Sequence, residues 1–191
     1  MFLVVLMQFV FFPVQQVYAA QSRVGMGTAD GFAVLGGSGI TNTGSTTITG
    51  DIGTHPTTDI TGLGSITLNG TNHAGDSVTQ GAKTDLVTAY DDAAGRTPVT
   101  TVATELGGTT KTAGVYDSAS GTFEITGTLT LNAEGNADAV FIFLTSSTLI
   151  TAAGAPGSPG SIVALVNGAQ ACNVYWKVGS SATIGTYSTF I

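Results

Sequence analysis

Charged residues are scarce in this 191-residue chain, where Asp, Glu, Lys and Arg together make up 9%. Soluble domains usually carry about a quarter. Five Lys and Arg stand against twelve Asp and Glu, which leaves a net charge of −7. Because a phosphate backbone is bound by clustered basic side chains, this balance excludes nucleic acid as a partner. Hydrophobic residues still reach 42%, so the low charge does not indicate a disordered chain.

Cysteine and histidine are almost absent. Cys172 is the only cysteine, which excludes a disulfide within the chain. It lies in the strand-like apolar segment 171–176, where we expect a buried, unreactive thiol. His55 and His73 are the only histidines, and both lie in segments rich in glycine and threonine. No metal-ligand spacing, phosphate loop or Gly-x-Ser-x-Gly motif is found, so we expect no cofactor, no bound metal and no enzyme.

The first residues have the pattern of a secretion signal. Residues 2–14 are apolar except for Gln8, and small or branched residues surround a cleavage point after Ala19. The alternative is a membrane anchor, but the apolar run is shorter than the roughly 20 residues that a spanning helix needs. We therefore expect residues 1–19 to be a signal peptide and 20–191 to be one secreted domain, free of the membrane after cleavage.

Short segments with a period of two dominate the rest of the chain. Residues 45–50, 65–70 and 127–132 alternate apolar side chains with Thr or Ser, and Gly or Asn closes each segment. Such alternation predicts strands with one buried and one exposed face. We expect coils of triangular section in a mainly β solenoid rather than a hairpin meander. The side chains expected inside are Ile48, Ile66, Leu68, Leu129, Leu131, Phe141, Phe143 and Trp176.

Two kinds of segment interrupt this pattern. Apolar residues spaced by three or four predict one helix over 77–95, capped by Asp76 or Ser77 and ended by Gly95. Residues 139–144 form a continuous apolar run, expected to be a strand buried between the coil interior and the helix. Residues 162–166 and 173–178 repeat that theme, and 152–160 read as a surface loop. The apolar positions expected on the helix's inner face are Val78, Ala82, Leu86, Ala89, Tyr90 and Ala93.

Several short sequence segments, in a fixed order, resemble those of a known protein family. Residues 32–41, 48–56, 88–96, 139–143 and 167–176 resemble the microbial ice-binding (antifreeze) proteins, and the resemblance covers about residues 31–190. It implies an irregular right-handed β-helix with one long α-helix packed alongside. It also implies a secreted, monomeric protein that adsorbs to the surface of ice crystals and inhibits their growth and recrystallisation, through a flat face rich in Thr, Ser, Gly and Ala.

The resemblance also nominates positions for that face, each of which could instead be an ordinary solvent-facing strand residue. Threonine suits such a face because its χ1 is stiff, and neighbouring coils repeat at about 4.8 Å. Thr122 is expected on a different side. The nominated ice-binding residues are Ser38, Thr41, Thr43, Ser146, Thr148, Ser180, Ser181 and Thr183.

One departure and two alternatives complete the interpretation. Family members continue past the position of Phe190 with coils that stack between the first coil and the rest, so we expect a C-terminally incomplete domain with exposed coil edges. The alternatives are an extracellular carbohydrate-binding or adhesin-type solenoid, which favours exposed aromatic residues, and a β-helix lyase or hydrolase. The second would need clustered carboxylates. We expect the adjacent Asp91 and Asp92 to be a solvated helix end rather than a catalytic pair.

Overall fold

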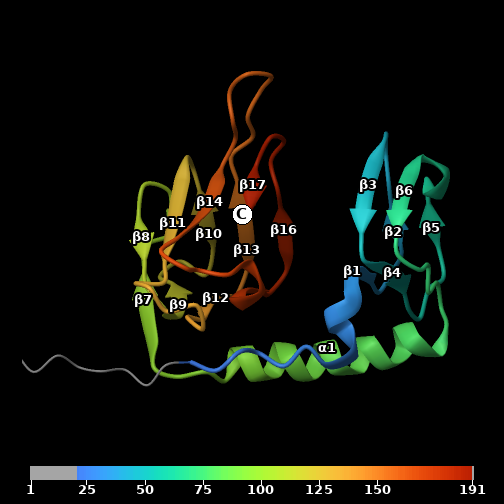
Figure 1. Ribbon diagram of the computed structural model, residues 1–191, viewed down its shortest axis with the longest axis horizontal. Coiled ribbons are helices and arrows are strands. Elements are labelled where there is room, and N and C mark those ends of the chain that lie inside the picture. The colour runs from blue at the N-terminus through green and yellow to red at the C-terminus, as the bar shows by residue number, and fades with distance from the viewer. Residues whose placement is uncertain (1–20, 191) are drawn as a thin grey trace, which may run out of the picture.

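Two separate stacks of parallel strands stand on one long α-helix (Figure 1). The structure is a computed structural model that describes residues 21–190. The signal peptide expected at 1–19 therefore lies outside the described residues. Every strand pair is parallel, which confirms coils rather than a hairpin meander. The mainly β solenoid with a single α-helix is confirmed for residues 21–190.

The N-terminal stack has two coils, each with three short strands. Two of the three strand pairs join residues 20 apart, such as Ile40 with Ile60, and the third joins residues 18 or 19 apart, such as Leu35 with Gly53. Ile48 pairs with Leu68 on the inner side and Thr47 with Thr67 on the outer side, as the alternation predicted. The 3-10 turn η1 (Gly27–Gly31) precedes the stack, and η2 (Leu63–Ser65) interrupts the second coil. The strands are β1 (Phe32–Gly36), β2 (Ile40–Thr41), β3 (Thr46–Thr49), β4 (Asp51–Thr54), β5 (Ile60–Thr61) and β6 (Ile66–Asn69).

The C-terminal stack is built from three sheets that enclose a triangular core. The sheet orders are β7-β9-β12-β15, β10-β13-β16 and β8-β11-β14-β17. Each of the last three coils adds one strand to each sheet, whereas the first coil adds only β7 and β8. The turn η3 (Ala171–Asn173) precedes β15. The strands are β7 (Val99–Val102), β8 (Thr110–Lys111), β9 (Gly114–Ser118), β10 (Phe123–Ile125), β11 (Thr128–Asn132), β12 (Phe141–Thr145), β13 (Thr148–Thr151), β14 (Ile162–Val166), β15 (Val174–Val178), β16 (Ser181–Thr183) and β17 (Thr189–Phe190).

Aromatic rings fill the interior of the C-terminal stack. Phe143 stacks on Trp176, with centroids 4.2 Å apart, and on Tyr116 at 5.4 Å, while Phe123 meets it edge-on. The predicted core residues Leu129, Leu131, Phe141 and Phe143 are fully buried. The other four predicted core residues lie on the inner side but are half-buried, because they belong to the two-coil N-terminal stack or to the last coil of the C-terminal stack. They are Ile48, Ile66, Leu68 and Trp176.

The helix α1 (Ser77–Ala94) begins and ends as predicted. The Asp76 side chain caps it by accepting the Thr79 N–H at 2.9 Å, and Gly95 follows its last residue. Small residues face the strands: Ala82, Ala89 and Ala93 are buried. Thr79 is buried with them. The prediction that Val78 and Tyr90 lie on the inner face was wrong, since they are 46% and 40% exposed. A face of small residues lets the helix lie close to the coils, so bulkier neighbours remain at its flanks.

The N-terminal segment seals the junction between α1 and the C-terminal stack. Val24 is buried with Ala89 and Ala93 against Val115 and Ile142 of the helix-facing sheet. Figure 1 shows this segment running along the helix. The run 139–144 is accordingly buried on both sides, as expected: Ile142 faces the helix, while Phe141 and Phe143 face the core.

Residues 162–166 were also expected to be buried on both faces, but only Val163 is buried there. The strand β14 lies in a sheet that α1 does not cover, so its outer side faces solvent. Cys172 also differs from expectation, because it is exposed in the η3 turn at a corner of the last coil. The loop 152–160 lies at the surface as predicted, protruding between β13 and β14 (Figure 1). No helix within residues 21–190 is long and apolar enough to cross a membrane.

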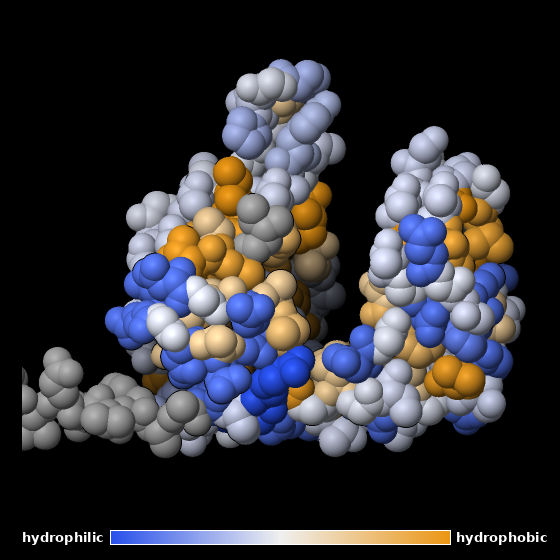
Figure 2. Space-filling model, in the orientation of Figure 1, coloured by the Kyte–Doolittle hydropathy of each residue, from blue (hydrophilic) through white to orange (hydrophobic). Residues whose placement is uncertain are grey.

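A deep hollow separates the two stacks above the middle of α1 (Figure 2). The strands β1, β2 and β3 border it on one side, and β15, β16 and β17 on the other (Figure 1). Within residues 21–190 these edges pair only with strands of their own stack. The inner side chains of the last coil line a small cavity of about 190 Å³ there, including Trp176 and Phe190. The exposed coil edges expected from the sequence are therefore observed.

Candidate functional site

Two outer faces of the stacks are free of the helix. We call the face formed by β2, β5, β10, β13 and β16 the first open face. The second open face is formed by β3, β6, β8, β11, β14 and β17. The hollow divides each face into one part on the N-terminal stack and one part on the C-terminal stack (Figure 1).

Hydroxyl side chains form rows on the first open face. Thr148 and Ser181 are Cα partners in neighbouring strands. Thr122 extends this row, because its Oγ1 lies 3.2 Å from Thr148 Oγ1. The next outward row is mixed, because it contains Glu124, Ile150 and Thr183. Members of a row repeat at the strand spacing of about 4.8 Å.

The expectation that Thr122 lies on a different side is therefore wrong. Phe123 pairs with Leu149, so the residues that precede them, Thr122 and Thr148, point outward together. The sequence spacing hides this because the coils differ in length. Partners lie 26 residues apart between β10 and β13 (123 to 149) but 33 apart between β13 and β16 (149 to 182).

The other nominated residues of the C-terminal stack lie at a corner of the coils. Ser180 donates its Oγ–H to the Ser147 carbonyl at 3.0 Å, so it aligns with Ser147 rather than with Ser146. Ser146 is exposed in the turn between β12 and β13. These serines border the first open face without belonging to its rows.

The nominated residues of the N-terminal stack lie across the hollow. Thr41 projects from β2 beside Thr61 of β5, its Cα partner. Ser38 and Thr43 are exposed in the turns on either side of β2. Sequence reasoning missed Thr61, although the 20-residue offset that joins Thr41 to Thr61 also joins Thr47 to Thr67 and could have revealed it.

The first open face carries charge on β10, where Glu124 pairs with Ile150 of β13, and the exposed Asp59 immediately precedes β5. Glu105 and Glu124 are bridge partners and both are exposed. Glu105 Oε1 accepts the Thr126 N–H at 2.9 Å, which fixes one carboxylate against the backbone. The outward positions of β13 and β16 are uncharged, as are Thr41 and Thr61. None of these positions is aromatic, so the face lacks the stacking platforms that sugar sites favour.

The second open face is less uniform. Thr49 and Asn69 are neighbours in the N-terminal stack, and Thr110 and Thr130 are partners in the C-terminal stack. The outward side of β14 replaces the hydroxyl row with apolar side chains, among them Val166. This face therefore provides comparison positions for the first.

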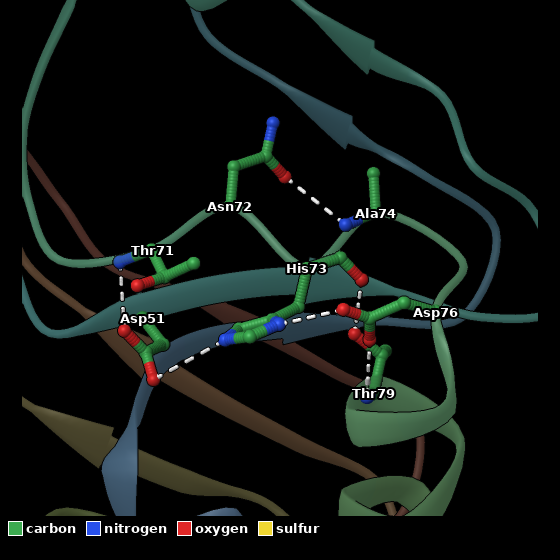
Figure 3. Close-up of polar contacts among 7 residues, drawn as sticks. All are labelled: Asp51, Thr71, Asn72, His73, Ala74, Asp76 and Thr79. Atoms are coloured by element: carbon green, nitrogen blue, oxygen red, sulfur yellow. Dashed lines mark hydrogen bonds and ion pairs between the residues drawn. The ribbon is translucent and has the colours of Figure 1, made fainter.

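A carboxylate–histidine cluster lies between β4 and the start of α1, which belong to neither open face (Figure 3). His73 Nδ1 lies 2.7 Å from Asp76 Oδ2, and Nε2 lies 3.7 Å from Asp51 Oδ2. The Thr79 N–H and then the His73 ring lower the pKa of Asp76. Because carboxylates face both ring nitrogens, neither is directed at a hydroxyl nucleophile, and the cluster does not have the geometry of a catalytic triad.

Other acidic residues have structural partners. Asp92 pairs with Arg96 at 2.7 Å, and this guanidinium lowers the pKa of Asp92. That contact supports the interpretation of Asp91 and Asp92 as a helix end. Among residues 21–190, no group of three or more His, Cys, Asp or Glu side chains could hold a metal ion.

Comparison with known protein families shows to which family the chain is related. Residues 34–191 match the model of the family described as Ice-binding-like. The chain belongs to the Ice-binding-like family. This match covers both stacks and α1, so it includes all of the rows described above.

Relatives and solved structures of ice-binding-like proteins agree with this placement. An ice-binding protein of Nostoc sp. (strain HG1) is 41% identical over 167 residues, and one of Colwellia sp. is 34% identical over 191. The alignments cover 87% and 90% of this chain. They cover 59% and 71% of those proteins, so the chain spans about three fifths of the Nostoc relative.

The fold is shared as well. The crystal structure of an ice-binding protein from an Antarctic biological consortium is 41% identical, with a TM-score of 0.85 over 95% of this chain and 79% of that one. The ice-binding protein of the ascomycete Antarctomyces psychrotrophicus gives 38% and 0.80, over 87% of this chain and 79% of that one. These comparisons indicate a family of ice-binding proteins rather than a family of enzymes.

Proposed function

We propose that this ice-binding-like chain adsorbs to ice through its first open face, slows crystal growth and recrystallisation, and catalyses no reaction. The observation that carries the proposal is the row of Thr122, Thr148 and Ser181, whose short hydroxyl side chains project at the strand spacing. The names of the relatives support it.

The physical argument rests on rigidity and on low charge. Threonine has few χ1 options on a strand, so little side-chain entropy is lost when the surface adsorbs. A rigid lattice with a step of about 4.8 Å can order water in a pattern that merges with the crystal. Charged groups would orient water around themselves, and the outward positions of β13 and β16 carry none. Molecules fixed on the growing front then force it to curve between them, which lowers the local freezing point.

The proposal includes secretion and a monomeric state. Support for secretion comes from the apolar segment 2–14 and the small residues near Ala19. A monomer suffices because the row of Thr122, Thr148 and Ser181 lies within a single chain.

Tyrosine substitutions on matched threonines test the face. Adsorption depends on many weak contacts made in one plane, so a protruding ring should lift neighbouring positions off the crystal. We expect Thr148→Tyr and Ser181→Tyr to abolish thermal hysteresis and ice shaping. Thr130→Tyr on the second open face and Thr84→Tyr on α1 should retain both. Thr122 cannot serve as a control, because it lies in the same row as Thr148.

Circular dichroism melts check that each variant folds, since surface substitutions usually shift stability by about 0.5 kcal/mol or less. Loss of activity in Thr130→Tyr with retention in Thr148→Tyr would move adsorption to the second open face. A labelled chain that is excluded from a growing ice hemisphere would refute ice adsorption altogether.

A further inference from the structure

His73 lies between two carboxylates that belong to different parts of the fold (Figure 3). Asp51 begins β4 of the N-terminal stack, and Asp76 caps α1. Nδ1 is 2.7 Å from Asp76 Oδ2, and Nε2 is 3.7 Å from Asp51 Oδ2. The side chain of His73 is only 17% exposed. One imidazole ring therefore connects the strand stack with the start of the helix.

Backbone hydrogen bonds hold both carboxylates in place. Asp51 Oδ1 accepts the Thr71 N–H at 2.7 Å, and Asp76 Oδ1 accepts the Thr79 N–H at 2.9 Å. The second oxygen of each carboxylate is thereby left facing the ring. Neither carboxylate can turn away from His73 without losing a hydrogen bond to the backbone.

The number of ring protons decides whether this arrangement is favourable. A neutral imidazole has one N–H donor and one lone pair, whereas an imidazolium has two donors. If the neutral ring donates from Nδ1 to Asp76, the lone pair of Nε2 faces the anionic Oδ2 of Asp51. The imidazolium removes that repulsion and attracts both carboxylates.

No other charged group among residues 21–190 forms an ion pair with either carboxylate. Asp51 faces the ring from β4 and Asp76 from the start of α1, while β1 contributes the uncharged ring of Phe32 at 5.7 Å. The charge state of His73 therefore decides whether the ring attracts both carboxylates or faces Asp51 with a lone pair.

The cluster is also where the N-terminal stack is attached to α1. Thr79 donates its hydroxyl to the His73 carbonyl, and its side chain packs against Gly53 of β4 so closely that a Cβ at Gly53 would overlap it. The same stack carries Thr41 and Thr61 of the first open face. A shift of the stack on the helix would move these residues relative to the rows on the C-terminal stack.

We propose that protonated His73 is a positioning residue that fixes the N-terminal stack on α1 and so holds Thr41 and Thr61 at a constant position relative to the row of Thr148 and Ser181. This inference rests on the proposed adsorption through the first open face. Because the charged form favours the fixed position, adsorption should be stronger at low pH and weaken once the pH is high enough to remove the second ring proton.

Asp51→Asn is the variant that separates charge from structure. The Asn oxygen can still accept the Thr71 N–H, while its NH₂ group can donate to the lone pair of a neutral His73. We therefore expect Asp51→Asn to keep its activity at pH 5.5 and to lose the pH dependence. His73→Gln cannot gain charge, so its profile should be flat and low. His55→Gln is the matched control, since it removes the other histidine and should leave the wild-type profile unchanged.

Two measurements on the full chain at pH 5.5, 7.0 and 8.5 test the proposal. One is ice recrystallisation inhibition. The other is the hydrogen-exchange protection factor of the Thr71 and Thr79 amides, which does not involve ice. In the wild type we expect both to fall with pH, with protection decreasing about fivefold.

The outcomes distinguish the two proposals. A flat wild-type protection profile, or a profile that disappears in His55→Gln but persists in Asp51→Asn, would overturn the role of His73. If protection falls with pH as expected but no variant affects ice at any pH, the positioning role stands and adsorption through the first open face is refuted.

Discussion

Phe143 is the residue whose truncation should cost the C-terminal stack most. Its ring is fully buried and lies between Trp176 at 4.2 Å and Tyr116 at 5.4 Å, with Phe123 against its edge at 5.9 Å. Phe143→Ala removes the middle ring and leaves a closed cavity that strands on three sides prevent from collapsing. Such changes cost about 3–5 kcal/mol. In a domain of this size each kcal/mol lowers Tm by about 2–4 °C, so we expect a fall of about 6–20 °C.

Two neighbouring aromatic residues provide a graded comparison. Trp176 is half-buried in the last coil, and Phe190 is 41% exposed at the edge of the hollow. Truncation of Trp176 opens its space toward the hollow rather than enclosing a cavity, and truncation of Phe190 removes still less buried surface. We therefore expect the loss of Tm to decrease in the order Phe143→Ala, Trp176→Ala, Phe190→Ala.

Thermal melts followed by far-UV circular dichroism measure this order directly. Equal losses for Trp176→Ala and Phe143→Ala would contradict the reasoning, because they would mean that the end of the stack is covered in solution. A change of less than about 1 kcal/mol for Phe143→Ala would show that the core can repack around the missing ring.

Two further predictions concern the effect of acid on stability and the space around two glycines. Thr28 donates its hydroxyl and its N–H to Asp85 Oδ2 at 2.6 and 2.7 Å, and these bonds lower the pKa of Asp85. A carboxylate with a lowered pKa stabilises the fold above about pH 3.9, and this contribution is lost as the pH falls further. The Tm difference between wild type and Asp85→Asn should therefore shrink between pH 5 and pH 2. A constant Tm difference would contradict this. Gly70→Ala should lower Tm because a Cβ at this position would overlap the Gly50 carbonyl. Gly64→Ala is the control, since a Cβ there meets open space and should leave Tm within a few degrees of the wild type. Equal Tm values for the two variants would refute the close approach of the two coils.

Local patterns were sufficient to predict much of the fold. The alternation in residues 45–50 and 127–132 correctly separates inward Ile48 and Leu129 from outward Thr49 and Thr128, because a strand has only two sides. The helix is bounded as expected because Asp76 and Gly95 act through contacts within a few residues. These features depend on neighbours in sequence, which a single chain shows directly.

Features that depend on alignment between coils were harder to predict. The position of Thr122 follows from a register across 26 residues, while the next coil needs 33 because the loop 152–160 lengthens it. A period of two cannot determine which outward residues of unequal coils meet. The exposure of Val78 depends on how closely α1 lies against the coils, and that of Cys172 on a turn at a coil corner. None of these is encoded by local spacing.

The helix α1 also sets a common scale for the two stacks. Lys83 Nζ reaches Gly37, next to β1, and Lys177 of β15 lies over the ring of Tyr90 at 4.6 Å. Seven residues of helix separate these contacts (83 to 90), which is about 10.5 Å at about 1.5 Å per residue. The two stacks have no strand pairing with each other within residues 21–190, so the helix that both contact fixes the distance between their hydroxyl rows. The length of an α-helix thereby becomes a determinant of how well a β surface can match a crystal.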